Sequence, residues 1–594
     1  MIKRLLDEVD LRVGYRTFLR GAADAPVRGG ASWAYVLGTT TVVLFLVLLV
    51  TGIALAIFYS PSSTDAWASI VYIEREIPLG ALLRAIHLHA HSALVITAFL
   101  HLVRVVLWGA YKAPREATHI TGLILLVLIT VFSLTGYLLP FDQNAFWATK
   151  VRMGIVGGAP VVGELQTRIL LGGNDIGNLS LTRFYALHTM VLPLMFMALV
   201  ALHLVFFRRH GATPRPKTSD ADAERATERY WPKQAAFDGV AALIVIVLVL
   251  AVSSHHPAPL EAPADPAAAY IARPEWYFLF LFQLLKYFHG ALDVVGKVVA
   301  PTVAMLFLAA LPFLDRAPVR RLAARRGVLG VFAVGLLGMA VLASLAVRAD
   351  ARDPALAQQR VRAEREATRA KLIAKDGVPV EGATFMAAND PLIRGERVFW
   401  AECASCHPLE GVEPRKVKAP DLTSYRSKAW LRQVLRDPDS RRLFGATKVH
   451  GMKPLTEASE AELARLVEYL HALRGTPAPT AHAAGVEALL EKFECAKCHD
   501  FEDDYGLDGP ALLDYGAERW VRNVVENAGA DHLYGKPNTM PKFMGRLSGR
   551  DITAVVAFLM SLEDRSAVGL WPNVDEPAPT PRVVPTSTAA ESGG

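Results

Sequence analysis

Cysteine is scarce in this chain, which has four cysteines among 594 residues and none before position 403. All four fall into two short pairs, a distribution that argues against a disulfide scaffold. Charge is sparse too: charged residues make up 20% and hydrophobic residues 52%, which excludes disorder for most of the chain. The net charge of +6 is small and no basic-aromatic motif accompanies it, so no nucleic-acid partner is expected.

Long apolar runs are abundant and lie mostly before Val347. Seven of them are long enough to cross a bilayer about 30 Å thick. They cover residues 34–58, 81–108, 119–139, 183–207, 236–253, 297–314 and 327–347. A further apolar segment, 276–288, is too short to span and is predicted to be re-entrant or interfacial. The sequence therefore predicts an all-α membrane protein.

Lysine and arginine are concentrated at the N-terminus and in alternate loops between the spans. The positive-inside rule then places the N-terminus in the cytoplasm and everything after the seventh span outside. No signal peptide is visible. Residues 1–32 carry Ile2, Leu5, Leu6 and Val9 at helical spacing, which indicates either an amphipathic surface segment or a plain solvated terminus.

Four histidines lie at matched depths in two of the predicted spans. His87 and His101 are 14 residues apart, and His188 and His203 are 15 apart. Because four helical turns take about 14.4 residues, each pair occupies one helix face, with its members about 21 Å apart. In antiparallel helices His87 would meet His188 and His101 would meet His203. This pattern predicts two bis-histidine iron sites, each holding a non-covalent b-type haem.

Four glycines repeat the same period in the first and third spans, namely Gly38, Gly52, Gly122 and Gly136. Each pair is again 14 residues apart. Glycine lets a flat macrocycle approach a helix closely, although helix packing alone could also explain a single glycine. The shared period favours the haem interpretation.

The second half of the chain carries a repeated five-residue motif, Cys403-Ala-Ser-Cys406-His407 and Cys495-Ala-Lys-Cys498-His499. This spacing is typical of covalent c-type haem, with thioethers to the cysteines and iron bound by the histidine. A zinc site would need further ligands at comparable spacing. The two motifs predict two small helical domains, 389–475 and 485–565, after a spacer at 348–388 and before a disordered tail at 566–594.

Each predicted c-type domain also offers a methionine as the sixth iron ligand. Met452 is the candidate in the first domain, with His450 as its rival, and Met540 is the candidate in the second, with Met544 as its rival. Pairing each methionine with the histidine of its own domain predicts two His/Met haems, with His407 and His499 as the other ligands.

Residues 1–315 resemble the cytochrome b family of quinol–cytochrome c reductases, most closely its b6 branch. The stretches that carry the resemblance are Lys112-Ala-Pro-Arg-Glu116, Thr135-Gly-Tyr-Leu-Leu-Pro140, Leu181–Thr189 and Pro274-Glu275-Trp276-Tyr277. The likeness implies a dihaem domain over 33–210, and a region over 211–347 that carries the quinol-site loop. The tail resembles tandem class I c-type cytochromes, with Pro420 and Pro510 beside their histidines. Val36 stands where the b6 branch has a haem-attaching cysteine, so that additional covalent haem is not expected.

The resemblance also implies residue roles around a quinol site. Glu275 is expected to accept a quinol proton, with Tyr137 and Tyr277 lining the same pocket. Arg84 and Arg104 are candidates for pairing haem propionates, or for reaching the membrane interface. His210 is a candidate for protonating an inner quinone.

These inferences lead to one functional prediction. The chain is expected to be the cytochrome b/c fusion subunit of a respiratory quinol–cytochrome c reductase in a bacterial inner membrane. Expected partners are quinol, a separate Rieske iron–sulfur protein, a soluble cytochrome c or terminal oxidase as acceptor, and a second copy of the complex. The alternative is a non-bifurcating haem relay that delivers quinol electrons to a periplasmic reductase.

Overall fold

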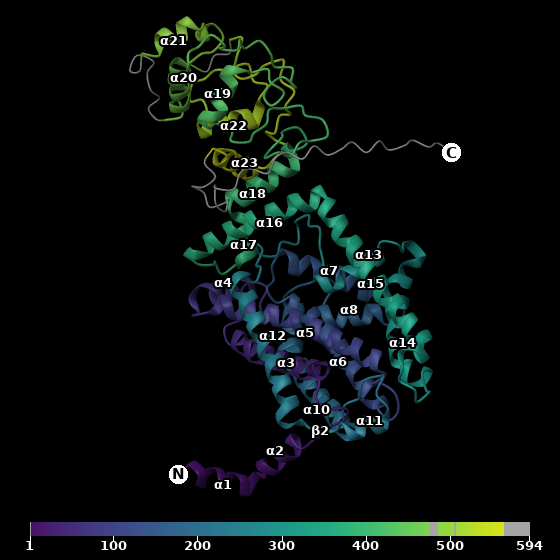
Figure 1. The fold of residues 1–594 in the computed structure, drawn as a ribbon. Helices are drawn as coiled ribbons and strands as arrows, with labels where there is room; N and C mark the ends of the chain where they lie inside the picture. Colours follow the sequence, from purple (N-terminus) through teal and green to yellow (C-terminus); the bar gives the residue numbers. More distant parts are fainter. Residues whose placement is uncertain (1, 476–484, 504–506, 564–594) are drawn as a thin grey trace, which may run out of the picture. The chain divides into compact units, whose positions relative to one another are not determined.

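The computed structural model describes residues 2–475, 485–503 and 507–563. The described chain forms two compact units, one comprising residues up to Ala363 with Val380–Ala383, the other Glu364–Pro379 with the chain from Thr384 onward. Most of its regular structure is helical, as Figure 1 shows. Within the described ranges, regular strands are limited to Pro26–Val27 and Glu228–Arg229, which pair antiparallel. The predicted all-α class is therefore confirmed.

Seven helices of the first unit are long and apolar enough to cross a membrane, as predicted. They are built on α3 (Val36–Ala56), α5 (Gly80–Trp108), α6 (Glu116–Tyr137), α9 with α10 (Asn178–Ala186 and Leu192–His210), α12 (Ala235–His255), α14 (Ala300–Leu314) and α15 (Arg326–Arg352). A π-helical turn at Val295–Val299 extends α14 to the length of a span. The short apolar segment forms a turn at Trp276–Phe278 followed by α13 (Leu279–Leu285), too short to span.

Shorter helices occupy the connections of this unit. They are α1 (Ile2–Val13), α2 (Tyr15–Ala23), α4 (Ala66–Glu76), α7 (Gln143–Gly157), α8 (Gly163–Leu171) and α11 (Asp220–Arg225). On α1, Leu5, Leu6 and Val9 are all exposed. An exposed apolar stripe on a formed helix favours the amphipathic surface segment over a plain solvated terminus.

The core of the membrane unit lies between α3, α5, α6 and α10. Its buried side chains include Leu44, Phe45, Leu94, Leu128 and Phe196. The rings of Phe45 and Phe196 are 4.5 Å apart. In sequence these residues fall midway between the paired histidines and glycines, so an apolar layer separates the two histidine levels.

A buried charge network ties the loop after α5 to the loop after α14. Asp315 accepts hydrogen bonds from Lys112, from the Tyr111 hydroxyl at 2.6 Å and from Arg325 Nε at 2.8 Å. Arg325 also donates to the carbonyls of Val106 and Leu107. Each buried charge is therefore paired, which low-dielectric surroundings require.

The second unit contains the region with the two cysteine motifs. Its helices are α16 (Pro354–Ile373, which begins in the first unit), α17 (Ala383–Asn389), α18 (Pro391–Val398), α19 (Lys428–Arg436), α20 (Glu460–Ala472), α21 (Glu487–Lys492), α22 (Glu518–Asn527) and α23 (Gly549–Ser561). The predicted tail at 566–594 lies outside the described residues.

The expected spacer at 348–388 is not a free connector. Arg365 of α16 pairs with Glu396 and Glu410, and Arg369 pairs with Asp390 at 2.9 Å. These partners belong to the region of the first cysteine motif, and their side chains are largely buried. The second half of α16 is therefore part of the second unit, held there by ion pairs that sequence periodicity could not reveal.

Candidate functional site

The structure brings together the two histidines of α5 with His188, which lies just before α10, and His203 of α10, in the pairs that their spacing predicts. The ring centroids of His87 and His188 are 6.3 Å apart. Metal–imidazole bonds are about 2 Å long, so this separation leaves room for one metal ion between the rings. His101 and His203 form the second level, where their side chains interact electrostatically.

Each of the four glycines faces one of these histidines from the neighbouring helix. A Cβ placed on Gly52 would lie 3.1 Å from Cε1 of His87, and one on Gly122 would lie 3.2 Å from Cε1 of His203. Gly38 faces His101 and Gly136 faces His188 in the same way. The glycines were expected to make room for a macrocycle. In the structure they make room for the imidazole rings that would bind its iron.

Three threonines, which the sequence analysis missed, hold the histidine rings. Thr51, Thr121 and Thr135 each lie within 3.1 Å of a histidine Nδ1, on His87, His203 and His188 respectively. All three hydroxyls also donate to a carbonyl one turn earlier in their own helices.

Because each hydroxyl proton is already committed, the threonine oxygen accepts from Nδ1–H, which leaves the Nε2 lone pair for a metal. In the sequence, these threonines could have been found from the dipeptide Thr-Gly, which occurs at three of the four glycine positions. At the fourth, Leu37 precedes Gly38.

A π-helical turn at Leu187–Val191 contains His188 and joins α9 to α10. In this turn the amide of Leu192 donates to the carbonyl of Leu187, five residues earlier. Pro193 follows and has no N–H to continue the α-helical pattern. The turn absorbs one extra residue, which explains how a 15-residue spacing on this helix matches a 14-residue spacing on α5.

The two cysteine motifs have the local geometry expected of haem attachment. His407 Nδ1 lies 2.9 Å from the carbonyl oxygen of Pro420, and His499 Nδ1 lies 2.8 Å from that of Pro510. Both prolines therefore lie beside their histidines, as predicted. These bonds orient each ring and leave its Nε2 for iron. The four cysteines are not joined in disulfides.

The candidate sixth ligands differ in burial from their rivals. Met452 and Met540 pack against the core of the second unit. Met544, by contrast, is 51% exposed. His450 is exposed and pairs with Asp439 at 3.0 Å. Burial against the core favours the two methionines over both rivals.

Glu275, Tyr137 and Tyr277 converge, as predicted, near the His87–His188 level. The Tyr137 hydroxyl hydrogen-bonds Glu275, and the Tyr277 hydroxyl hydrogen-bonds Ser133. The Tyr277 ring lies 5.8 Å from that of His91, one turn beyond His87 on α5. Burial raises the pKa of Glu275, although Arg152 and the Tyr137 hydrogen bond work in the opposite direction.

Arg152 is the residue of this pocket that the sequence analysis overlooked. Its guanidinium carbon lies 4.2 Å from the centre of the Tyr137 ring, close enough for a cation–π contact. Both Nη atoms are buried, with no hydrogen-bond partner among the described residues. Its signal in the sequence was a basic residue on the side of the membrane where lysine and arginine are scarce. The pocket thus combines a carboxylate, two phenols and a buried cation.

The arginines expected at haem propionates have protein partners in the structure. Arg84 donates to Glu74 and to the carbonyl of Ala258 at 2.9 Å. Arg104 stacks on Trp108, 4.5 Å from its ring centre. His210 ends α10, and its carbonyl accepts a hydrogen bond from Arg115. Roles for these three residues at haem or quinone stay predictions.

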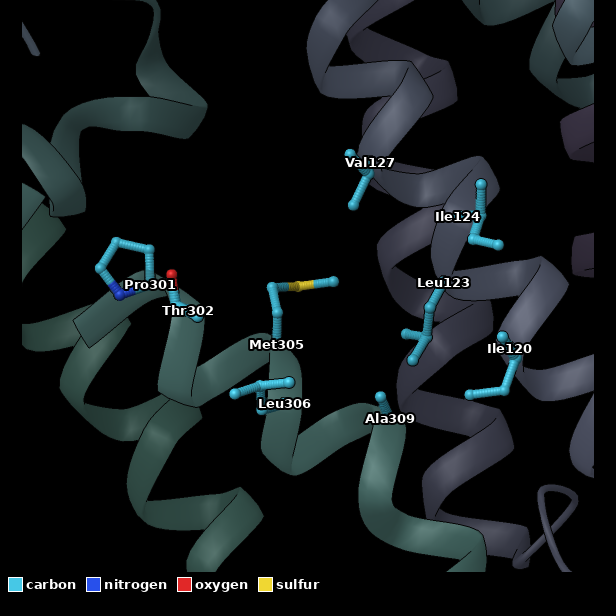
Figure 2. Close-up of a pocket in the computed structure, with 9 residues that line it drawn as sticks. All are labelled: Ile120, Leu123, Ile124, Val127, Pro301, Thr302, Met305, Leu306 and Ala309. Carbon is cyan, nitrogen blue, oxygen red and sulfur yellow. The ribbon is translucent and has the colours of Figure 1, made fainter. Parts of the chain in front are cut away.

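A cavity of about 470 Å³ lies between α6 and α14. Figure 2 shows its lining, with Ile120, Leu123 and Val127 on one side and Pro301 and Met305 on the other. This lining could cover a lipid or isoprenoid chain, but it has no charged group to orient a quinone ring.

Apolar spans, two levels of facing histidines and two Cys-x-x-Cys-His turns together define a membrane-integral cytochrome of mixed b and c type. Residues 22–211 match the family described as Cytochrome b/b6/petB, and residues 263–362 match Cytochrome b(C-terminal)/b6/petD. Residues 390–470 and 481–559 match Cytochrome C oxidase, cbb3-type, subunit III. The chain belongs to the cytochrome b/b6 family, and these matches imply binding of haem b and haem c.

Individual relatives agree with this assignment. Cytochrome b6 of Rippkaea orientalis is 42% identical over 177 residues, which cover 30% of this chain and 80% of that protein. Cytochrome b6 of a Synechococcus strain is 38% identical over 210 residues, or 35% of this chain and 98% of that protein. Among solved structures, a chain of a hyperthermophilic respiratory Complex III aligns with a TM-score of 0.52 and 26% identity, covering 58% of this chain and 91% of that chain.

Proposed function

We propose that this chain is the electron-transferring core of a quinol–cytochrome c reductase of a bacterial inner membrane. Quinol is oxidised in the pocket of Glu275, on the outer side, and electrons leave it both across the membrane and outward to the c-type region. The observation that carries the proposal is the convergence of Glu275, Tyr137 and Arg152 beside the His87–His188 level.

The side chains of this pocket suit the removal of protons from a quinol. The carboxylate of Glu275 acts as a general base for one quinol proton. Its raised pKa brings it closer to the working pH, where a general base is most effective. Tyr137 hydrogen-bonds the carboxylate and Arg152 stabilises its charge electrostatically, while the Nη groups of Arg152 present polar hydrogens to the ring oxygens of the substrate. When bound, haem supplies one-electron redox chemistry at both histidine levels and at the two cysteine motifs.

The residues that would hold four haems fit that task. His87 with His188 and His101 with His203 would hold two b-type groups. The hydrogen bonds at Nδ1 of His87, His188 and His203 leave Nε2 of these three rings for iron. Cys403, Cys406 and His407 would hold one c-type group, and the equivalent second motif would hold another. Pyridine haemochrome spectra should then give a b to c ratio near one, and haem staining should mark the denatured chain. A band without covalent haem would refute the proposal.

A separate Rieske iron–sulfur protein is proposed as the first outward electron acceptor. A Rieske cluster needs two cysteines and two histidines, and all four cysteines of this chain lie in the Cys-x-x-Cys-His motifs. Purification in mild detergent should therefore retain a partner with a Rieske signal in electron paramagnetic resonance. The acceptor beyond the c-type region is proposed to be a soluble cytochrome c or a terminal oxidase, and the complex is proposed to be a homodimer.

The alternative, a non-bifurcating haem relay, makes a different prediction. If the isolated chain reduced its b-type and c-type haems with quinol at the full native rate, no Rieske partner would be needed. The Pro274-Glu275-Trp276-Tyr277 loop, together with helices α12, α14 and α15, favours the reductase, because a simple haem relay does not need these elements.

A further inference from the structure

The two c-type repeats, residues 389–475 and 485–565, exchange their closing helices, so that each closing helix packs against the opening segment of the other repeat. Helix α18, which leads into Cys403, packs against α23, the closing helix of the second repeat. Arg394 of α18 pairs with Asp551 of α23 at 2.7 Å. A Cβ on Gly395 would lie 2.0 Å from the carbonyl oxygen of Ala554, so the two backbones cross in direct contact. The opening helix of the first repeat is thus covered by the end of the second.

The reciprocal exchange joins α20, the closing helix of the first repeat, to the entry of the second. Lys492 at the end of α21 pairs with Glu462 of α20 at 2.6 Å. Arg465 of α20 donates to the carbonyl of Gly485 at 2.8 Å. Beyond the second cysteine motif, the rings of Tyr469 and Phe501 lie 6.1 Å apart. Buried residues of both repeats accordingly form one hydrophobic core.

The segments that carry the methionines follow these exchanged helices. Met540 lies between α22 and α23, and Arg546 of the same segment pairs with Glu402 at 2.5 Å. Glu402 directly precedes Cys403. Correspondingly, Lys453, directly after Met452, lies 3.6 Å from Glu494, which directly precedes Cys495.

Glu402 and Glu494 hold equivalent places in the two repeats. If each repeat closed on itself, the Met452 segment would lie beside Glu402. In the structure it lies beside Glu494.

We propose that the two c-type haem pockets are crossed between the repeats. The haem attached at Cys403 and Cys406 takes Met540 as its sixth ligand, and the haem attached at Cys495 and Cys498 takes Met452. The histidine side of each pocket stays within its own repeat, because His407 and His499 bind Pro420 and Pro510. This inference rests on the c-type haem attachment of the proposed function, and it replaces the pairing within each repeat that sequence order suggested.

The test uses the full-length chain with one covalent haem removed. In a Cys495→Ala/Cys498→Ala variant, the single remaining c haem should keep the visible charge-transfer band that marks methionine bound to ferric haem. Adding Met540→Ala should abolish this band, while adding Met452→Ala or the control Met544→Ala should leave it. Loss of the band with Met452→Ala and its survival with Met540→Ala would overturn the crossed arrangement.

A second measurement works on the unmodified chain and does not depend on removing haem. A carbodiimide forms an amide directly between a paired lysine and carboxylate, with water taken up by the reagent. Peptide mass spectrometry should find Lys453 joined to Glu494, with the Lys428–Glu468 pair, 2.6 Å apart within the first repeat, as a positive control for the reaction. A Lys453–Glu402 cross-link in its place would refute the crossed haem pockets. The haem staining described above tests the proposed function separately.

Discussion

Gly136 and His188 are in such close contact that a methyl group on the glycine would lie 2.5 Å from Cε1 of the histidine ring. At the other level the same distance between Gly38 and His101 is 3.5 Å, an ordinary van der Waals contact. His188 lies in the π-helical turn Leu187–Val191. The Gly136 and Gly38 positions are therefore not equally tolerant of added volume.

This contrast makes a matched pair of alanine variants informative. Gly136→Ala should displace His188 and lower the content of b-type haem by about half, because an interior packed to native density cannot absorb such an overlap. Gly38→Ala should retain both b-type haems. Reduced-minus-oxidised spectra of the purified chain measure this content, with the c-type haems as an internal standard. Equal haem content in the two variants would contradict the proposed role of His188.

The hydrogen bond from His188 to Thr135 gives a second prediction. Thr135→Val keeps the side-chain shape but removes the acceptor of Nδ1–H, so the ring loses its tautomer restraint and some of its basicity. Loss of such a partner typically weakens metal-site affinity about 10–100-fold. We expect weaker retention of one b-type haem and a changed midpoint potential in a redox titration.

Thr130→Val is the control for this variant. Thr130 lies on the same helix, but its hydroxyl donates only to the carbonyl of Val127 and contacts no histidine. Identical titrations for the two variants would show that the Thr135 hydroxyl does not support the ligand.

Glu275 should govern the acid side of the pH profile. Burial raises its pKa, and only the deprotonated carboxylate can accept a proton. Turnover of the wild-type complex should therefore fall as the pH decreases through this raised pKa. Glu275→Gln should lower turnover about 10-fold or more and lose this acid limb, with haem spectra unchanged. Glu164→Gln, at an exposed carboxylate paired with Arg168, is the control and should keep the wild-type profile.

Asp315 should be critical for stability, because it pairs two buried cations. Asp315→Ala would leave Lys112 and Arg325 buried without their carboxylate, a change that typically costs about 3–5 kcal/mol. Thermal denaturation in detergent should show a clearly lower midpoint. Asp293→Ala breaks a less buried pair with Lys297 and should have a much smaller effect. Similar losses in both variants would argue against the network.

The same carboxylate predicts how stability depends on pH. Burial alone would raise the pKa of Asp315, but hydrogen bonds from Lys112, Tyr111 and Arg325 outweigh it and lower the pKa. A depressed pKa adds stability above the unfolded value of about 3.9. This contribution is lost as the pH falls from there through the folded pKa. The difference in thermal-denaturation midpoint between the wild type and Asp315→Ala should therefore become smaller at acidic pH.

Features that repeat along the chain were predictable from the sequence. The seven spans follow from uninterrupted apolar runs, and the pairing of His87 with His188 follows from helical periodicity. The Pro420 and Pro510 contacts came from the family resemblance. In each of these cases, a local pattern or a family motif determines the structural feature.

Features that depend on tertiary contacts were not predictable in this way. The partners of Thr135 lie on its own helix and in the π-helical turn before α10. The burial of Arg152 depends on where α7 packs. The exchange of α18 and α20 between repeats was invisible for a further reason. The two repeats share one pattern, so their sequences do not reveal which closing helix covers which opening helix.

The contact between Gly395 and Ala554 has a consequence for how this architecture can evolve. A gene that gained or lost only one of the two repeats would leave the opening helix of the survivor without its cover. Because the two repeats share one pattern, a single surviving repeat would have to close on its own final helix. Gain or loss of one repeat therefore requires the core to be rebuilt, whereas gain or loss of both together does not.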